Sequence, residues 1–189
     1  MGLLQVLTGR RRLRPPSTDR LFAIATAGVA FEAAGMACDG AAAIVFQSLE
    51  TADFRSIVED MKEVVGATAA ELAASVQTTQ DEYGFSWLIL RGGDLDGLVT
   101  GVNAVADAIQ AGGYGERLLC AVFPFRDGQR RKLYWIYNFK RGSFYPFVPE
   151  PGSQRRDNER ELILRAQAER ELPIEPELSR WFALWGIPI

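Results

Sequence analysis

Two apolar runs, 118–125 and 132–139, flank the dipeptide Asp127-Gly128, and this arrangement constrains the fold more than any other feature of the sequence. Asp-Gly between two apolar segments is a strong signal for a β-hairpin. A further turn at 140–142 leads into another apolar run at 143–148. The pattern therefore predicts three neighbouring antiparallel strands in this part of the chain.

The other predicted strands also follow one another along the chain and do not alternate one by one with helices. Runs 22–31 and 41–49 contain Val, Ile and Phe and are separated by Gly35 and Asp39-Gly40. We interpret them as a second hairpin. Run 85–90 predicts a further strand. Strands grouped in this way favour a mainly antiparallel sheet. We expect an α+β fold with a sheet of about five to seven strands.

Two segments repeat apolar residues with a helical period. Segment 54–65 predicts a helix that ends at Gly66, with a shorter helix near 67–74 and a polar segment at 75–82 after it. Segment 95–109 predicts a second helix. We expect these two amphipathic helices to pack on the sheet.

Caps and prolines mark the remaining helix boundaries. Asp94 is a suitable N-cap for the helix over 95–109, and Asp157 or Asn158 for a charged helix that runs to about residue 171. Pro176 is expected to start a short last helix that carries Leu178, Trp181, Phe182 and Trp185. The pattern thus predicts C-terminal helices.

Residues 1–16 are interpreted as a basic, apolar head on a single α+β domain that spans 17–189 and includes the C-terminal helical tail. Leucines at helical spacing precede a cluster of arginines, and Pro15-Pro16 cannot continue a helix. This pattern suits an anionic membrane surface or an acidic partner, and the alternative is an ordinary terminus with solvated arginines. The candidate contact residues are Leu3, Leu4, Leu7, Arg10, Arg11, Arg12 and Arg14.

The chain contains no histidine, which excludes the commonest general base, the commonest zinc ligand and every nucleophile that depends on an imidazole. Cys38 and Cys120 form no Cys-x-x-Cys pair and are interpreted as reduced thiols. The glycines at 112–115 match neither phosphate-binding fingerprint, and the carboxylates at 81–82 and 157–161 show no arrangement that defines an active site. We therefore expect no catalytic residue, no cofactor and no metal.

Charge and hydropathy bear on the location and on the partners. The formal net charge of −3 argues against a protein that coats nucleic acid. The charge is uneven, because five arginines and one aspartate give residues 1–20 a charge of +4 and leave −7 for the rest. No apolar stretch is long enough to span a bilayer, and the first residues do not follow the pattern of a secretory signal. We expect a cytoplasmic protein, with peripheral contact at the inner face of the membrane as an option.

The densest group of aromatic residues lies between 134 and 147. Alternation along a strand puts Trp135, Tyr137 and Phe139 on one face and Tyr134 and Ile136 on the other. One face can fill the core, and the other needs cover from a helix, the tail or a partner. Core packing and a recognition surface for a peptide or single-stranded nucleic acid both remain open. The candidate partner-binding residues, here and in the tail, are Trp135, Tyr137, Phe139, Lys140, Arg141, Phe144, Tyr145, Trp181 and Trp185.

Five segments together carry a family resemblance. They are Met-Gly-Leu-Leu at 1–4 with its arginine cluster, Tyr83-Gly84-Phe85-Ser86-Trp87-Leu88, the block at 137–147, Arg155-Arg156-Asp157-Asn158, and the block at 172–182. In these segments the chain resembles the PspAB family of PspA-associated proteins, of the actinobacterial and archaeal type. The resemblance implies a cytoplasmic protein encoded beside a homologue of phage-shock protein A, a coiled-coil protein that binds stressed anionic membranes. The resemblance implies an association with this PspA homologue and does not imply any enzymatic reaction.

The favoured hypothesis is a non-enzymatic adaptor or regulator in envelope stress. It binds a PspA-like protein through the aromatic hairpin or the tail, with residues 1–14 as a second contact. One alternative is a small enzyme of unknown reaction that uses carboxylates and Arg141 or Arg155-Arg156 on a phosphate-bearing ligand. The other is a module that binds single-stranded nucleic acid. Assembly with an identical copy is compatible with each of them.

Overall fold

The computed structural model describes residues 17–71 and 75–189. Within these residues seven strands form one antiparallel sheet in the order β3-β4-β2-β5-β6-β7, and the short β1 pairs with β5 outside this path. The sheet is open, with β3 at one edge and β7 at the other. The strands are β1 (Ala37–Cys38), β2 (Ala41–Gln47), β3 (Ser75–Gln80), β4 (Phe85–Arg91), β5 (Leu118–Arg126), β6 (Lys132–Asn138) and β7 (Ser143–Phe147).

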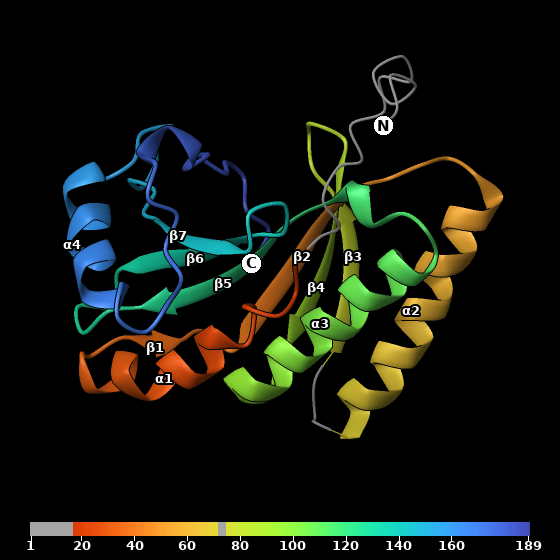
Figure 1. The fold of residues 1–189 in the computed structure, drawn as a ribbon, viewed down its shortest axis with the longest axis horizontal. Helices are drawn as coiled ribbons and strands as arrows, with labels where there is room; N and C mark the ends of the chain where they lie inside the picture. Colours follow the sequence, from red (N-terminus) through yellow and green to blue (C-terminus); the bar gives the residue numbers. More distant parts are fainter. Residues whose placement is uncertain (1–16, 72–74) are drawn as a thin grey trace, which may run out of the picture.

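Four α-helices accompany the sheet in the described part of the chain, and together with the strands they make the α+β fold that the sequence predicts. They are α1 (Ala23–Ala33), α2 (Ala52–Glu71), α3 (Leu95–Ala111) and α4 (Asn158–Ala168). Helices α2 and α3 run side by side at the β3 end of the sheet, and α4 stands beside β7 at the opposite end (Figure 1). Asp94 caps α3 as predicted, because its side chain accepts a hydrogen bond of 2.8 Å from the N–H of Gly97.

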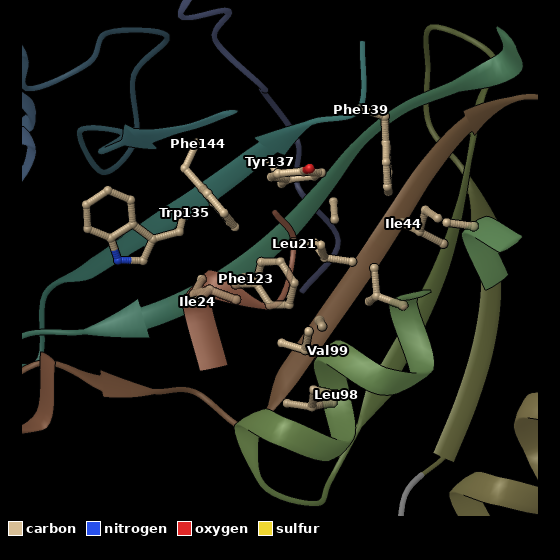
Figure 2. Packing of buried hydrophobic residues seen from close by; sticks show 14 of the residues in the cluster. Leu21, Ile24, Ile44, Leu98, Val99, Phe123, Trp135, Tyr137, Phe139 and Phe144 are labelled. Atoms are coloured by element: carbon tan, nitrogen blue, oxygen red, sulfur yellow. The ribbon is translucent and has the colours of Figure 1, made fainter. Parts of the chain in front are cut away.

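The main core lies between the helices and one face of the sheet. Leu98 and Val99 of α3 face Ile44 of β2 and Phe123 of β5 (Figure 2). Val99, Ile44 and Phe123 have no solvent exposure. Because burying a side chain of this size contributes about 1.5–3 kcal/mol, the apolar stripe of α3 accounts for much of the attachment of this helix to the sheet.

The opposite face of the sheet is covered by the last segment of the chain, residues 173–189, which we call the C-terminal strap. The strap begins along the free edge of β7, where Ile174 forms a parallel bridge with Phe144. It then crosses the sheet face and adds Trp181 and Ile189 to a second apolar cluster with residues of β2, β4, β5, β6 and β7. The sheet is therefore apolar on both faces.

The predicted meander is confirmed, whereas the hairpin predicted from runs 22–31 and 41–49 is wrong. Strands β5, β6 and β7 pair in sequence, as expected from Asp127-Gly128. Segment 22–31, expected as a strand, belongs to α1 instead. Its alanines favour a helix more strongly than its Val, Ile and Phe favour a strand, and its buried residues Ile24, Ala27 and Phe31 recur at helical spacing.

Three further boundaries differ from the expectation. Helix α2 continues through Gly66 to Glu71, because a glycine inside a long helix costs only about 1 kcal/mol. The polar segment after it contains β3, an edge strand whose Thr and Gln side chains need little burial. The helix expected from Pro176 is a single 3₁₀ turn, Leu178–Arg180, followed by irregular strap.

Candidate partner-binding surface

The aromatic residues of β6 and the following turn fill the main core. Trp135, Tyr137 and Phe139 have no solvent exposure. The ring of Trp135 stacks on Phe31 of α1 at 5.2 Å between centroids, and Tyr137 meets Phe139 edge to face at 5.4 Å. Phe144 is equally buried and lies over Tyr137 at 4.7 Å. Of the two interpretations left open by the sequence, core packing is the one that this burial supports.

The aromatic residues on the other face are covered by the C-terminal strap. Tyr145 stacks on Trp181 at 6.2 Å, and its hydroxyl donates a 3.1 Å hydrogen bond to the carbonyl of Phe182. Trp185 is half-buried and packs edge to face on Phe147. Burial raises the pKa of Tyr145 well above its ordinary value, so this hydroxyl stays protonated as a donor. The structure thus brings Tyr145, Trp181 and Trp185 together, as contacts within the chain.

A buried ion pair attaches the strap to α4, and sequence reasoning missed it. The carboxylate of Glu161 accepts two hydrogen bonds of 2.8 Å, one from Nε of Arg156 and one from the backbone N–H of Val148. The same guanidinium donates through Nη1 to the carbonyl of Trp181 at 2.6 Å and lies over the ring of Phe147. Burial raises the pKa of Glu161, and the hydrogen bonds from Arg156 and Val148 oppose that rise. The sequence offered one hint of this pair, which is that Arg156 directly precedes Asp157, the predicted N-cap of the helix.

Several of the carboxylates and arginines considered for catalysis are engaged in the fold. Asp157 caps α4 by accepting from the N–H of Arg160 at 2.9 Å. Asp81 holds the β3–β4 turn, where its two oxygens accept from the N–H of Phe85 and from the indole N–H of Trp87, each at 2.9 Å. Arg155 pairs with Glu150 at 2.8 Å on the surface. Among the described residues, no group of three potential metal ligands comes together.

The basic turn between β6 and β7 lies beside the point where the head joins the domain. Lys140 and Arg141 are exposed at this turn. The N–H of Ser17 donates to the carbonyl of Phe139 at 3.0 Å, and the hydroxyl of Tyr137 donates to the carbonyl of Ser17 at 2.8 Å. Burial raises the pKa of Tyr137; of the two exposed charges near its hydroxyl, Arg20 lowers that pKa and Asp19 raises it. We call Arg20, Lys140 and Arg141 the exit surface.

The seven head residues expected to contact a membrane or a partner lie outside the described residues, and the structure locates only the place where the head begins. They are Leu3, Leu4, Leu7, Arg10, Arg11, Arg12 and Arg14. In the described remainder of the chain, no helix has the length and apolar character needed to cross a bilayer.

Helix α1 presents an apolar face to solvent, and this feature was hidden by the prediction of a strand. Phe22 and Val29 are 43% and 77% exposed. Thr26, Ala30 and Ala33 complete this side, which we call the outer α1 face, and the exposed Glu32 flanks it. Apolar side chains exposed together on a helix mark a surface that can contact another molecule. The outer α1 face is therefore a candidate contact surface, and it begins two residues after Arg20.

Comparison with known proteins gives one family. The family model PspAB, described as PspA associated protein B, matches residues 1–189. No curated protein matches the chain.

Proposed function

The chain belongs to the PspAB family, PspA associated protein B, and on that premise we propose that it is a non-enzymatic adaptor or regulator that binds a PspA-like coiled-coil protein in an envelope-stress, phage-shock system. The observation that supports a specific contact is the anchoring of Ser17 on the β6–β7 turn. It places Ser17, the first described residue after the head, beside the turn that carries Lys140 and Arg141.

The geometry moves the expected contact away from the aromatic rings. Trp135, Tyr137 and Phe139 have no exposed surface to offer, while the exit surface and the outer α1 face are open. Apolar side chains flanked by cations suit an amphipathic helix with acidic flanking positions, as in helix-in-groove recognition and coiled-coil pairing. We assign the partner contact to these two surfaces and to the head.

The residues that the sequence assigned to the two alternatives give them little support. Stacking of nucleobases needs exposed aromatic rings, and those of β6 are buried. A phosphate-binding enzyme built on Arg155 and Arg156 would need to break their pairs with Glu150 and Glu161, and Arg141 is the exposed arginine that this alternative keeps. Lys140 and Arg141 remain available for an anionic membrane surface, which is the second contact that the proposal includes.

Co-purification with the PspA homologue from the same genome tests the proposal. Three forms are compared with the wild-type chain: Lys140→Glu with Arg141→Glu, Val29→Glu on the outer α1 face, and Ile163→Glu. The last is the matched control, because Ile163 on α4 is also an exposed apolar side chain. We expect retention to be lost in the first two forms and kept in the control.

Two results count against the proposal in different ways. Equal retention of all four forms would place the interface elsewhere on the domain. Absence of any complex with the wild-type chain would remove the adaptor function itself. Flotation with vesicles of anionic or zwitterionic lipid tests the membrane contact separately, and equal flotation with the two lipids would exclude an electrostatic contact.

A further inference from the structure

Two adjoining hollows open between the first half of α2 and the ends of β2 and β3, and we call them together the α2 cleft. Their volumes are about 250 and 360 Å³, and Ser48 and Val58 line both of them. Phe46 and Phe54 supply a buried apolar floor. The hydroxyls of Ser48 and Ser86 hydrogen-bond to each other at the wall. The cleft therefore suits an apolar side chain that enters from a polar surface.

The surroundings of the α2 cleft are acidic. Between residues 50 and 63 the sequence has five acids and two bases. Those acids are all exposed: Glu50, Asp53, Glu59, Asp60 and Glu63. Glu50 and Glu59 line the cleft together with Arg55, and the exposed Glu82 adds a carboxylate at the turn that follows Gln80. An occupant that carries apolar and basic residues close together would match both the floor and the rim.

The chain itself contains such a segment. Residues 1–16 have Leu3, Leu4 and Leu7 followed by four arginines, and no acid. Their point of attachment is close to the cleft. Ser17 is bonded to Phe139, whose N–H donates to Leu119 of β5, and β5 is the neighbour of β2 in the sheet.

The tether is long enough. From Phe139, which directly follows β6, the sheet order passes through β5, β2 and β4 to β3, a distance of about 19 Å at 4.7–4.9 Å per strand. The ten residues between Leu7 and Ser17 can span roughly 33–36 Å when extended, and Pro15-Pro16 favours extended backbone. The leucines can therefore reach the cleft while the arginines pass its acidic rim.

From these observations we propose that the head of the chain, residues 1–16, docks in the α2 cleft of the same molecule, with its leucines in the cleft and its arginines against the acidic rim. Docking shields the arginines of the head, so an anionic partner must compete with the rim for them. The docking itself is a property of the isolated chain and stands or falls apart from the partner proposed above.

Crosslinking within the full-length chain tests the docking. In a background with Cys38→Ser and Cys120→Ala, Leu7→Cys is combined with Thr78→Cys, an exposed position that lines the cleft. The matched control carries the same two cysteines together with Leu3→Ser and Leu4→Ser, so the tether is identical and only the apolar anchor is lost. Near-ultraviolet circular dichroism verifies that both forms are folded. The reagent is a short bis-maleimide.

We expect the first form to crosslink at least about tenfold faster than the control, at a rate that does not depend on protein concentration and that falls in 1 M NaCl. Equal rates in the two forms would show that the head only samples the cleft by tethered diffusion, and would overturn the proposal. A rate that rises with protein concentration would also overturn it, because the occupant would then be the head of a second copy. A rate unchanged by salt would remove the arginines from the contact.

Discussion

The buried pair of Arg156 and Glu161 attaches the C-terminal strap, so removing its charge should destabilise the fold. The side chain of Glu161 is 2% exposed and that of Arg156 is 19% exposed. Removing one member of a buried ion pair leaves the other without compensation and costs about 3–5 kcal/mol. Since Arg156 keeps some contact with water, we place Glu161→Gln at the lower end of that range, near 3 kcal/mol. Glutamine keeps the volume and can still accept from Val148.

Urea denaturation and thermal unfolding measure the effect. For a domain of this size each kcal/mol lowers the Tm by roughly 2–4 °C, so Glu161→Gln should lower it by about 6–12 °C. The control is Glu150→Gln, which breaks the pair with Arg155 at the same 2.8 Å separation but on the surface, where the side chains are 37% and 78% exposed. The loss there should stay below about 1 kcal/mol.

A double-mutant cycle with Arg156→Met measures the interaction energy of the pair apart from the contacts that each side chain makes with its surroundings. The double variant should lose about 2 kcal/mol less free energy of unfolding than the two single variants lose in sum, because the unpaired charge is present only in the single variants. Arg156→Met should also speed hydrogen exchange in the strap, since it removes the donor to the carbonyl of Trp181. A Glu161→Gln variant as stable as Glu150→Gln, or an additive cycle, would refute the electrostatic attachment of the strap.

Three further predictions concern single side chains. Burial raises the pKa of Cys120 from 9.0 to about 12, so above pH 9 the unfolded chain loses a proton that the folded chain keeps, and stability falls with rising pH. Cys120→Ala should reduce that fall by about 1.4 kcal/mol per pH unit in urea denaturation between pH 9 and 11. Asp81→Ala should cost about 1–3 kcal/mol, because the indole N–H of Trp87 and two backbone N–H groups lose their acceptor, and an unchanged urea midpoint would contradict this role. Asp94→Ala should lower stability by about 1 kcal/mol through loss of the α3 cap, whereas Asp96→Ala, in the first turn of the same helix, should cost less in the same assay.

The meander of β5, β6 and β7 was predictable because its signals are local. The side chain of Asp127 accepts from the N–H groups of Gln129 and Arg131, so the residue that marks the turn in the sequence also holds it in the structure. The cap at Asp94 is local in the same sense. Elements of this kind require no knowledge of distant segments.

The elements that were missed depend on distant partners. Strand β3 is polar apart from Val76, and it becomes a strand because β4 lies beside it. The strap lacks periodicity, and Arg156, Tyr145 and the edge of β7 determine its path. The sequence showed which residue types could form the candidate site. It did not show that Trp135 is buried while Lys140 is exposed.

The position of the strap explains why the open apolar surface lies on a helix rather than on the sheet. An α+β sheet with helices on one side usually turns its other side to water, yet here that side holds Val45, Val122 and Ile136 and is covered by Trp181 and Ile189. The sheet therefore has little apolar surface left for a partner. The outer α1 face, by contrast, spans about 16 Å along an eleven-residue helix, which is enough for three turns of a partner helix to pack against it. With Arg20 at its start and Glu32 near its end, this face combines an apolar stripe with one charge of each sign, so an amphipathic helix with an acidic residue opposite Arg20 is the partner element that it fits best.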